Sequence, residues 1–315
     1  MRNDLAMVFP GQGAQSVGMM REFAAVSPAV AERFERASAV LGFDLWKLVQ
    51  EGPAEELNKT MNTQPALLAA SVATWDVWCA NGGPEPAFMA GHSFGEYTAL
   101  VCSGALAYED AVALVADRGR FMQEAVAPGS GAVFAVLGLD AGPLSAICAE
   151  AAQGQVVQCA NLNAPGQVVL SGDRAAVERA GALAKEKGAK KVIPLAVSVP
   201  VHCALMNAAA EKFAPRIAGI AFQTPRIPVI HNVDVEPHPE PAAIRDILVR
   251  QLAAGVRWSE TIERFAKSGV RAVVECGPGK VLTPLVKRCA GGLATYSLAA
   301  PADVTAAIAA LENQS

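Results

Sequence analysis

Short apolar runs, each followed by a Gly-rich or polar turn and then a helical pattern, recur along the chain. They lie at residues 5–9, 87–91 and 270–275, and the turns after them read PGQGAQS, HSFGEY and CGPGK. Repeated units of strand, turn and helix are typical of a parallel sheet flanked by helices. Residues 17–80 are rich in alanine and show a helical pattern broken by Gly-Pro and Asn-Thr. The pattern therefore predicts a large α/β domain.

The middle of the chain follows a different pattern. Strands are expected over residues 131–139, 156–161, 167–171 and 191–197, with helices over 143–153 and 173–187. The order strand, helix, strand, strand, helix, strand is that of a ferredoxin-like fold. We therefore predict a small ferredoxin-like domain at residues 127–197, inserted into a large domain made of residues 1–126 and 198–315.

Composition narrows the class of protein. The 315 residues are 52% hydrophobic and 18% charged, with a formal net charge of −4 at pH 7. This excludes a disordered chain and argues against a nucleic-acid partner, because nucleic-acid binders usually carry a basic surface. No stretch has the pattern of a transmembrane helix or a signal peptide, so we expect a cytoplasmic protein with no membrane partner. Seven widely spaced cysteines without a C-x-x-C pair argue against disulfides and a zinc site.

The strongest chemical signal is GHSFG at residues 91–95, which matches G-x-S-x-G between an expected strand and an expected helix. Small residues permit a tight turn that lifts the hydroxyl of Ser93 above the sheet, and the N–H groups at the helix N-terminus can face an oxyanion. Such an elbow is typical of an α/β-hydrolase-like domain with a serine nucleophile. The alternative is a Gly-rich turn whose serine only caps the helix.

A serine nucleophile needs a base, and the chain has four histidines. His92 adjoins the serine, but neighbouring side chains on a turn usually point apart. His231 and His238 lie at the Pro-rich loop EPHPE, where we expect them to be solvated. His202 has no Asp or Glu within eight residues, so its orienting partner would be a distant residue or a backbone carbonyl. The alternative for His202 is a core histidine with no catalytic role.

Seven motifs then occur in one order: FPGQGAQ (9–15), TQPAL (63–67), GHSFGE (91–96), ADRGRFMQ (116–123), VPVHCALM (199–206), VRQL (249–252) and ECGPGKVL (275–282). Together they closely resemble the malonyl-CoA:acyl carrier protein transacylases of bacterial type II fatty-acid synthesis, over nearly the whole chain. The sequence departs from that family at Phe94, where Leu or Gln is usual, and at Val201, where Ser is frequent. By this resemblance both positions border the acyl pocket, so they bear on acyl selectivity.

The resemblance implies ping-pong transfer of a malonyl group from malonyl-CoA to the phosphopantetheine thiol of acyl carrier protein, through a malonyl-serine intermediate. It also implies that a backbone carbonyl orients the catalytic histidine, that no metal or tightly bound cofactor is needed, and that the enzyme is a monomer. The residues implied are the nucleophile Ser93, the base His202, the oxyanion-hole residues Gln12 and Phe94, and the substrate-binding residues Arg118, Gln251 and Gln12.

Three alternatives remain open at this point. A trans-acting acyltransferase of polyketide synthesis has the same chemistry and a different carrier. A thioesterase or esterase of the α/β-hydrolase type shares the elbow, but its order along the chain is usually Ser, Asp, His. A non-catalytic docking protein would not need the serine, the histidine and the arginine together. Neither Gly-rich loop, GQGAQS or CGPGK, completes a nucleotide-binding fingerprint.

An acidic carrier protein requires a local basic patch on a chain that is itself negatively charged. Basic residues cluster at the end of the expected small domain and in the last Gly-rich turn and helix. They are Lys185, Lys187, Lys190, Lys191, Lys280, Lys287 and Arg288. A solvated helix end is the alternative explanation, because lysines there also favour the helix dipole.

Overall fold

A five-stranded parallel sheet forms the centre of the protein. The computed structural model describes residues 1–195, 197 and 199–313. The strand order is β7-β2-β1-β8-β9, and every neighbouring pair runs parallel. The strands are β1 (Arg2–Phe9), β2 (Pro86–Gly91), β7 (Val229–Ile230), β8 (Ala272–Glu275) and β9 (Ala294–Ser297). The parallel sheet predicted from the strand–turn–helix units is confirmed.

Both faces of this sheet are buried, as the central strand β1 shows. Leu5, Met7 and Phe9 enter one hydrophobic cluster, while Ala6 and Val8 enter another on the opposite face. Alternate side chains of a strand point to opposite faces, so a strand covered by helices on both sides is apolar throughout. The uninterrupted apolar run in the sequence follows from this burial.

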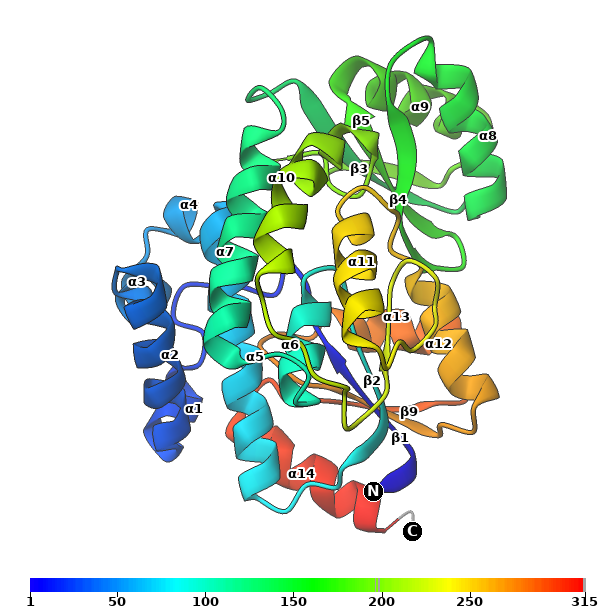
Figure 1. Ribbon diagram of the computed structural model, residues 1–315. Coiled ribbons are helices and arrows are strands. Elements are labelled where there is room, and N and C mark those ends of the chain that lie inside the picture. Colours follow the sequence, from blue (N-terminus) through cyan, green and yellow to red (C-terminus); the bar gives the residue numbers. More distant parts are fainter. Residues whose placement is uncertain (196, 198, 314–315) are drawn as a thin grey trace.

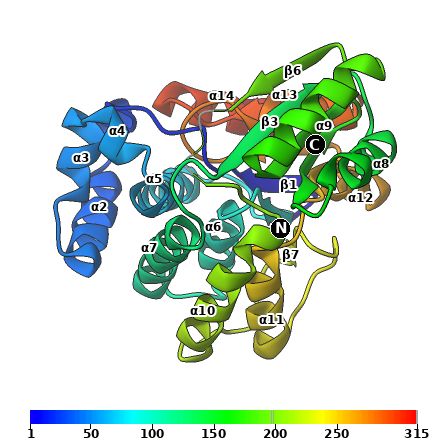
Figure 2. The same ribbon diagram turned by 90° about the horizontal axis from the view of Figure 1, so that it is seen from above.

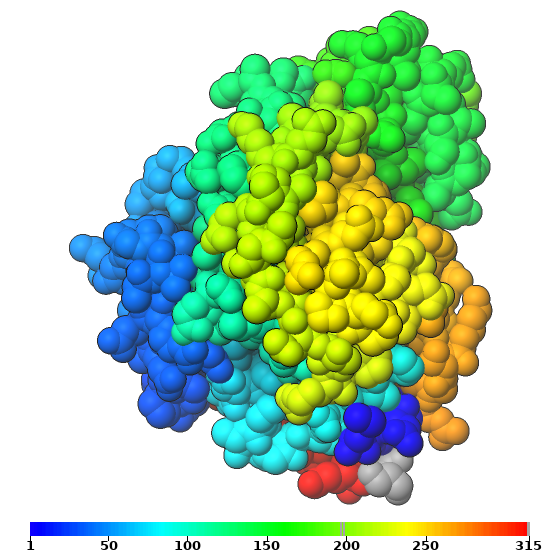
Figure 3. All heavy atoms as spheres, viewed as in Figure 1, coloured from blue at the N-terminus to red at the C-terminus, as the bar shows by residue number. Residues whose placement is uncertain are grey.

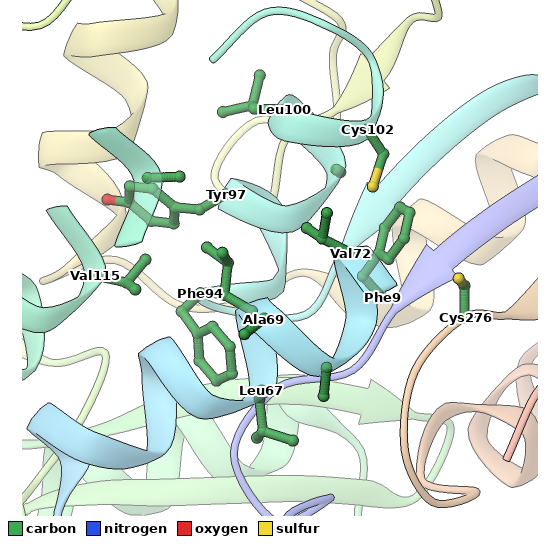
Figure 4. Packing of buried hydrophobic residues seen from close by; sticks show 14 of the residues in the cluster. Phe9, Leu67, Ala69, Val72, Phe94, Tyr97, Leu100, Cys102, Val115 and Cys276 are labelled. Carbon is green, nitrogen blue, oxygen red and sulfur yellow. The ribbon is translucent and has the colours of Figure 1, made fainter. Parts of the chain in front are cut away.

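Helices cover the two faces unequally, as Figures 1 and 2 show. The smaller cluster is formed with α12 (Trp258–Lys267) and α13 (Leu282–Cys289). The larger cluster, seen from close by in Figure 4, receives side chains from the remaining helices around the sheet. These are α1 (Arg21–Val26), α2 (Pro28–Leu41), α3 (Leu45–Glu51), α4 (Ala54–Leu57), α5 (Thr60–Ala80), α6 (Gly95–Cys102), α7 (Tyr108–Glu124), a short 3₁₀ turn η1 (Ala204–Met206), α10 (Asn207–Ala218), α11 (Pro241–Gln251) and α14 (Pro301–Glu312). Within the described ranges, no helix has both the length and the apolar character to cross a membrane.

A second, antiparallel sheet stands beyond the end of the parallel sheet and forms a separate lobe in Figures 1 and 3. Its strand order is β4-β5-β3-β6. Its elements are β3 (Gly131–Leu137), α8 (Ala141–Ala152), β4 (Val157–Ala164), β5 (Gln167–Asp173), α9 (Arg174–Glu186) and β6 (Lys191–Pro194). The lobe has a hydrophobic cluster of its own, to which both helices contribute. The small domain of the predicted fold class is therefore present.

The limits of this lobe differ in detail from the expected ones. The last strand ends at Pro194, earlier than expected. Asp173 precedes α9 as expected for a cap, but its carboxylate accepts a hydrogen bond from the N–H of Val156 at 2.8 Å and makes no cap bond. The domain boundaries at residues 126/127 and 197/198 stay predictions, and residue 198 lies outside the described residues.

The packing of α7 on α5 generates a stability prediction. A methyl group at Gly119 would lie 2.6 Å from Cα of Met61 and 2.7 Å from the carbonyl oxygen of Thr60. Because these are backbone atoms, the two helices would have to move apart. We expect Gly119→Ala to lower the free energy of unfolding by about 1–3 kcal/mol, as measured by urea denaturation.

The matched control is Gly142→Ala, in the first turn of α8. A methyl group there meets no atom within 4 Å. Because alanine loses less backbone freedom on folding than glycine, we expect this change to be neutral or to stabilise by up to about 1 kcal/mol. Equal losses of stability in the two variants would contradict the steric argument.

Candidate active site

Ser93 lies at the sharp turn between β2 and α6, so the GHSFG motif has the expected strand–turn–helix geometry. Its backbone φ is +55°, a left-handed value that is uncommon for a residue with a side chain. The turn is so tight that a Cβ at Gly91 would lie 1.8 Å from the carbonyl carbon of Gly95. Only glycine fits at residue 91, and the turn places Ser93 beyond the end of the strand.

Two buried amide side chains hold the peptide groups of Ser93. Oδ1 of Asn232 accepts a hydrogen bond from the N–H of Ser93 at 2.8 Å, and Nε2 of Gln251 donates to the carbonyl oxygen of Ser93 at 2.9 Å. Asn232 also donates from Nδ2 to the carbonyl of Gly91 at 2.8 Å. The strained backbone of the elbow is thus hydrogen-bonded on both sides.

His202 faces the serine from the segment that follows the small lobe. Its Nε2 lies 2.7 Å from Oγ of Ser93, and its Nδ1 lies 3.0 Å from the carbonyl oxygen of Gln251 and 3.1 Å from that of Ala254. Because carbonyl oxygens only accept, we assign the ring proton to Nδ1. The lone pair of Nε2 is then free to take the proton of the serine hydroxyl.

Two features of the site keep His202 neutral. Burial lowers the pKa of His202, and the positive charge of Arg118 lowers it further, to about 3. Both effects disfavour a second positive charge in the site. His202 therefore has the protonation state of a general base over the whole neutral range.

Arg118 reaches the serine from α7 and is 1% exposed. Its NH1 donates to Oε1 of Gln64 at 3.0 Å, and its NH2 donates to Oγ of Ser93 at 3.3 Å and to Oε1 of Gln251 at 3.0 Å. Arg120, two residues further along α7, instead bonds Asp117 at the surface. The two arginines face different directions, as their spacing on a helix predicts.

A cavity of about 400 Å³ opens in front of the serine. Polar and apolar side chains line it together, and the apolar ones include Val133 and Val169 of the small lobe. Residues that line it and belong to the expected site are Gln12, Ser93, Phe94, Arg118 and His202, together with Val201. Gln251 is fully buried and does not line the cavity, so it contacts Arg118 and the elbow from behind.

The expected oxyanion donors lie at the edge of this cavity. Within the described residues, the backbone N–H groups of Gln12 and Phe94 make no hydrogen bond, whereas that of Ser93 is occupied by Asn232. Unpaired N–H groups beside a nucleophile are suited to hold a developing oxyanion. The arrangement supports Gln12 and Phe94 as the donors and makes Ser93 N–H unavailable for that role.

The other histidines make no hydrogen bond to Ser93 among the described residues. His92 lines the cavity, but its Nε2 lies 2.8 Å from Oδ1 of Asn163. His238 bonds Asp234 at 2.7 Å. The expectation of a solvated His231 is wrong: it is fully buried, with Nδ1 2.6 Å from Oε1 of Glu96.

Sequence reasoning gave no role to Gln64, Glu96, His231 or Asn232, which together with Gln251 surround the reacting residues. Gln64 lies within TQPAL, so the motif contained the signal. His231 and Asn232 follow β7, which pairs with β2 beside the elbow. Polar residues at the carboxyl ends of neighbouring parallel strands meet at one edge of the sheet. β7 has only two residues, too few for its pattern to be recognised.

Comparison with known proteins identifies the family. The profile described as acyl transferase domain matches residues 6–305. The chain belongs to the acyl transferase domain family. A malonyl CoA-acyl carrier protein transacylase of Salmonella typhimurium is 56% identical to this acyl transferase over 303 residues, 96% of this chain and 98% of the relative.

Solved structures agree with this assignment. The malonyl CoA-acyl carrier protein transacylase of Coxiella burnetii has a TM-score of 0.96 and 49% identity, covering 98% of this acyl transferase and 97% of that chain. A malonyl-transacylase solved in complex with a type II PKS acyl-carrier protein has a TM-score of 0.96 and 52% identity, covering 98% and 99%. The family resemblance found in the sequence is confirmed.

The low pKa of His202 generates a prediction about pH. A base with an ordinary imidazole pKa would lose half its activity near pH 6.5. We expect acylation of this acyl transferase by p-nitrophenyl acetate to stay level as the pH falls from 7 to about 5, because His202 remains unprotonated there. Stopped-flow release of p-nitrophenol measures this rate.

Arg118→Ala provides the comparison. Removing the positive charge of Arg118 removes one of the two effects that depress the pKa of His202. The pH at which the acylation rate falls to half should therefore be higher in this variant. Two outcomes would contradict a base whose pKa is lowered at His202. One is a wild-type rate that is half-maximal near pH 6.5, and the other is a pH of half-maximal rate that is the same in the variant.

Proposed function

We propose that this chain transfers a malonyl group from malonyl-CoA to the phosphopantetheine thiol of acyl carrier protein, through a malonyl ester on Ser93. The observation that carries the proposal is a buried Arg118 in the cavity of the Ser93–His202 pair, bonded only to uncharged groups. An acyl group that bears a carboxylate complements this charge. Relatives named as malonyl CoA-acyl carrier protein transacylases over nearly the whole chain support the substrate and carrier.

The first half-reaction begins with the hydrogen bond between Ser93 and His202. Nε2 of His202 takes the hydroxyl proton while Oγ attacks the thioester carbonyl of malonyl-CoA. The oxyanion of the tetrahedral intermediate is held by the N–H groups of Gln12 and Phe94, a kind of interaction typically worth about 3–4 kcal/mol per donor. The intermediate then expels the CoA sulfur, which receives the proton from His202. The products are free CoA and malonyl-Ser93.

The second half-reaction reverses these roles on a new thiol. The phosphopantetheine thiol of the carrier protein gives its proton to Nε2 of His202 and attacks the ester carbonyl. The same N–H groups hold the oxyanion, and the Ser93 oxygen leaves and recovers the proton from His202. The malonyl group ends as a thioester on the carrier, and the enzyme returns to its initial state.

A hydrolase or thioesterase for neutral acyl groups fits this site less well. A neutral acyl group would offer the buried guanidinium of Arg118 no carboxylate to contact, so its charge would stay bonded to neutral acceptors only. A malonyl carboxylate would displace these neutral acceptors and take two parallel N–H donors of the same guanidinium. The charge of Arg118 therefore supports malonyl transfer over esterase chemistry.

The same chemistry serves a second carrier, that of polyketide synthesis. The solved malonyl-transacylase in complex with a type II PKS acyl-carrier protein favours this possibility. The proposal therefore names the carrier by class, an acyl carrier protein, and places the enzyme in the cytoplasm as a monomer with no nucleic acid or membrane partner. The net negative charge supports the absence of nucleic acid.

A surface hollow offers a local positive charge to an acidic carrier. Three basic residues and one acidic residue line it: Lys190, Lys191 at the start of β6, Arg288 of α13, and Asp140. Lys187 is instead paired with Glu150 at 2.5 Å, so its charge is offset. Basic residues from the two expected clusters thus come together across the lobe boundary, which supports a carrier-binding surface there.

The covalent intermediate gives the direct test of the proposed function. We expect malonyl-CoA to add one malonyl group to Ser93, found by peptide mass mapping, and holo acyl carrier protein to remove it as malonyl thioester. Ser93→Ala should abolish the label and lower transfer by several orders of magnitude, because the two-step route disappears. His202→Ala should slow both half-reactions.

Cys203→Ala is the control, since Cys203 is a buried thiol next to His202. This variant should keep the label. A label mapped to a cysteine, or release of the malonyl group as free malonate at the same rate with and without the carrier, would contradict the proposed transfer.

The charge of Arg118 generates a selectivity prediction. Arg118→Ala should lose malonyl transfer while keeping acetyl transfer, because only the malonyl group carries a carboxylate. Losing a charge-assisted bidentate pair suggests a change of about 3 kcal/mol, roughly a hundredfold in the ratio of malonyl- to acetyl-CoA kcat/KM. Arg118→Lys should restore only part of it, because an ammonium lacks the planar fork.

Arg120→Ala is the matched control on the same helix. Arg120 bonds Asp117 and Glu124 at the surface, so its loss should leave the ratio at the wild-type value. If Arg118→Ala lowered both activities by the same factor, Arg118 would be a structural residue and malonyl selectivity would need another origin.

A further inference from the structure

Arg118 carries a buried charge that no carboxylate contacts. Its hydrogen-bond acceptors are the amide oxygens of Gln64 and Gln251 and the hydroxyl of Ser93, and no ion pair among the described residues includes it. Its Nε has no partner within the same residues. A buried guanidinium needs a counter-charge nearby, so the surrounding residues should contain one.

Glu96 is the carboxylate nearest to it in the hydrogen-bond network. It is fully buried in the first turn of α6. Its Oε1 accepts from Nδ1 of His231 at 2.6 Å, and its Oε2 accepts from the N–H of Asn232 at 2.9 Å and from Nε2 of Gln251 at 2.8 Å. The same Gln251 amide presents Oε1 to Arg118 at 3.0 Å. One side-chain amide therefore connects the carboxylate to the guanidinium.

The amide cannot turn round in this position. A carboxylate only accepts hydrogen bonds and a guanidinium only donates them, so the NH₂ group of Gln251 must face Glu96 and its oxygen must face Arg118. The carbonyl of Ser93 fixes the same orientation, since it also accepts from Nε2 of Gln251. Glu96 thus sets the direction in which Gln251 contacts Arg118.

Both oxygens of Glu96 face hydrogen-bond donors, as an ionised carboxylate requires. Nδ1 of His231 donates to Glu96, and Nε2 of His231 is buried with no partner among the described residues. A proton on Nε2 would be a buried donor without an acceptor, so we assign the neutral tautomer. The Glu96–His231 pair then carries one negative charge, which balances the one positive charge of Arg118. Burial lowers the pKa of Arg118, and Tyr97 and then the charge of Glu96 act in the opposite direction.

We propose that Glu96 is the counter-charge of Arg118, held one side-chain amide away so that the guanidinium stays open to the carboxylate of the substrate. This rests on the proposed function, in which Arg118 binds the malonyl carboxylate. Glu96 is then a positioning and specificity-determining residue that does not touch the substrate. Its negative charge keeps Arg118 stable in the empty site, and its distance leaves the N–H donors of Arg118 to a group that arrives in the cavity.

A second arginine of the chain shows the alternative arrangement. Arg33 contacts Asp76 directly, with Nε 2.6 Å and NH2 3.1 Å from the two carboxylate oxygens. Such a bidentate pair uses the donors that recognise a carboxylate. An arginine paired in this way has little left for a substrate, whereas the amide oxygens around Arg118 are weaker, neutral acceptors that a malonyl carboxylate can displace or outcompete.

The first test is Glu96→Gln. The glutamine can keep the bonds to Asn232 and Gln251 through its oxygen while its NH₂ group faces Nδ1 of His231, which moves the ring proton to the unpartnered Nε2. The resulting loss of stability affects both acyl groups alike, so the ratio of their kcat/KM values reports the removal of the charge. The substrate carboxylate is then no longer repelled by Glu96. We expect the ratio of malonyl- to acetyl-CoA kcat/KM to rise about tenfold through a lower KM for malonyl-CoA, and free malonate to inhibit at about tenfold lower concentration. The ratio does not depend on the fraction of enzyme that is folded.

The second test exchanges the two groups in Glu96→Gln/Gln251→Glu. Net charge is unchanged, but the carboxylate now lies directly on Arg118. We expect the malonyl- to acetyl-CoA ratio to fall at least tenfold and malonate inhibition to weaken. The donor lost from the Ser93 carbonyl affects both acyl groups alike, so it cancels in the ratio.

Glu275→Gln is the matched control. Glu275 is also a buried carboxylate, but it accepts from the N–H groups of Val281, Leu282 and Thr283 at the start of α13. Its loss should lower thermal stability and leave the ratio unchanged. An unchanged or lower ratio in Glu96→Gln, or an unchanged ratio in the exchange variant, overturns the proposal.

The outcome for Arg118→Ala separates this proposal from the proposed function. If Arg118→Ala collapses the ratio while the Glu96 variants do not move it as expected, the role of Glu96 is wrong and the proposed function stands. If Arg118→Ala leaves the ratio unchanged, the assignment of the malonyl carboxylate to Arg118 fails first.

Discussion

The site depends on one strained peptide being held in place. Ser93 has a left-handed backbone, and two hydrogen bonds hold this conformation. Asn232 accepts from the N–H of Ser93, and Gln251 donates to its carbonyl oxygen. The backbone N–H of Asn232 and the side-chain amide of Gln251 in turn donate to the carboxylate of Glu96. The carboxylate of Glu96 therefore holds the elbow at Ser93 through two residues, Asn232 and Gln251, and contacts Arg118 through Gln251 alone. The residues of the proposed nucleophile and of the proposed malonyl-binding site share a single buried carboxylate.

The charge of Arg118 couples substrate binding to the strength of the base. Burial lowers the pKa of His202, and this charge lowers it further. A bound malonyl carboxylate neutralises it, so the pKa of His202 should rise only when the acidic acyl group is in place. A neutral acyl group leaves the base weak. In the proposed function the same residue therefore favours the malonyl group both in binding and in proton transfer.

The sequence predicted those parts of the site that depend on short-range patterns. The strand–turn–helix elbow around Ser93 and the opposite directions of Arg118 and Arg120 follow from local geometry. The choice of His202 among four histidines did not, and came from the family resemblance. The roles of Glu96 and Asn232 were missed because they depend on β7, a two-residue strand that lies beside the elbow only in the folded sheet.

The group that orients His202 is main chain, supplied by the carbonyls of Gln251 and Ala254 where α11 ends. A carbonyl is present whatever the side chain, so no single substitution deletes this member of the catalytic set. An aspartate in the same role could be lost by one codon change. The orientation of His202 depends instead on the number of residues in α11. Inserting or deleting one residue would rotate the end of the helix by about 100° and move the carbonyl groups away from the imidazole. Evolution of this segment should therefore tolerate exchanges of residues far better than changes in their number.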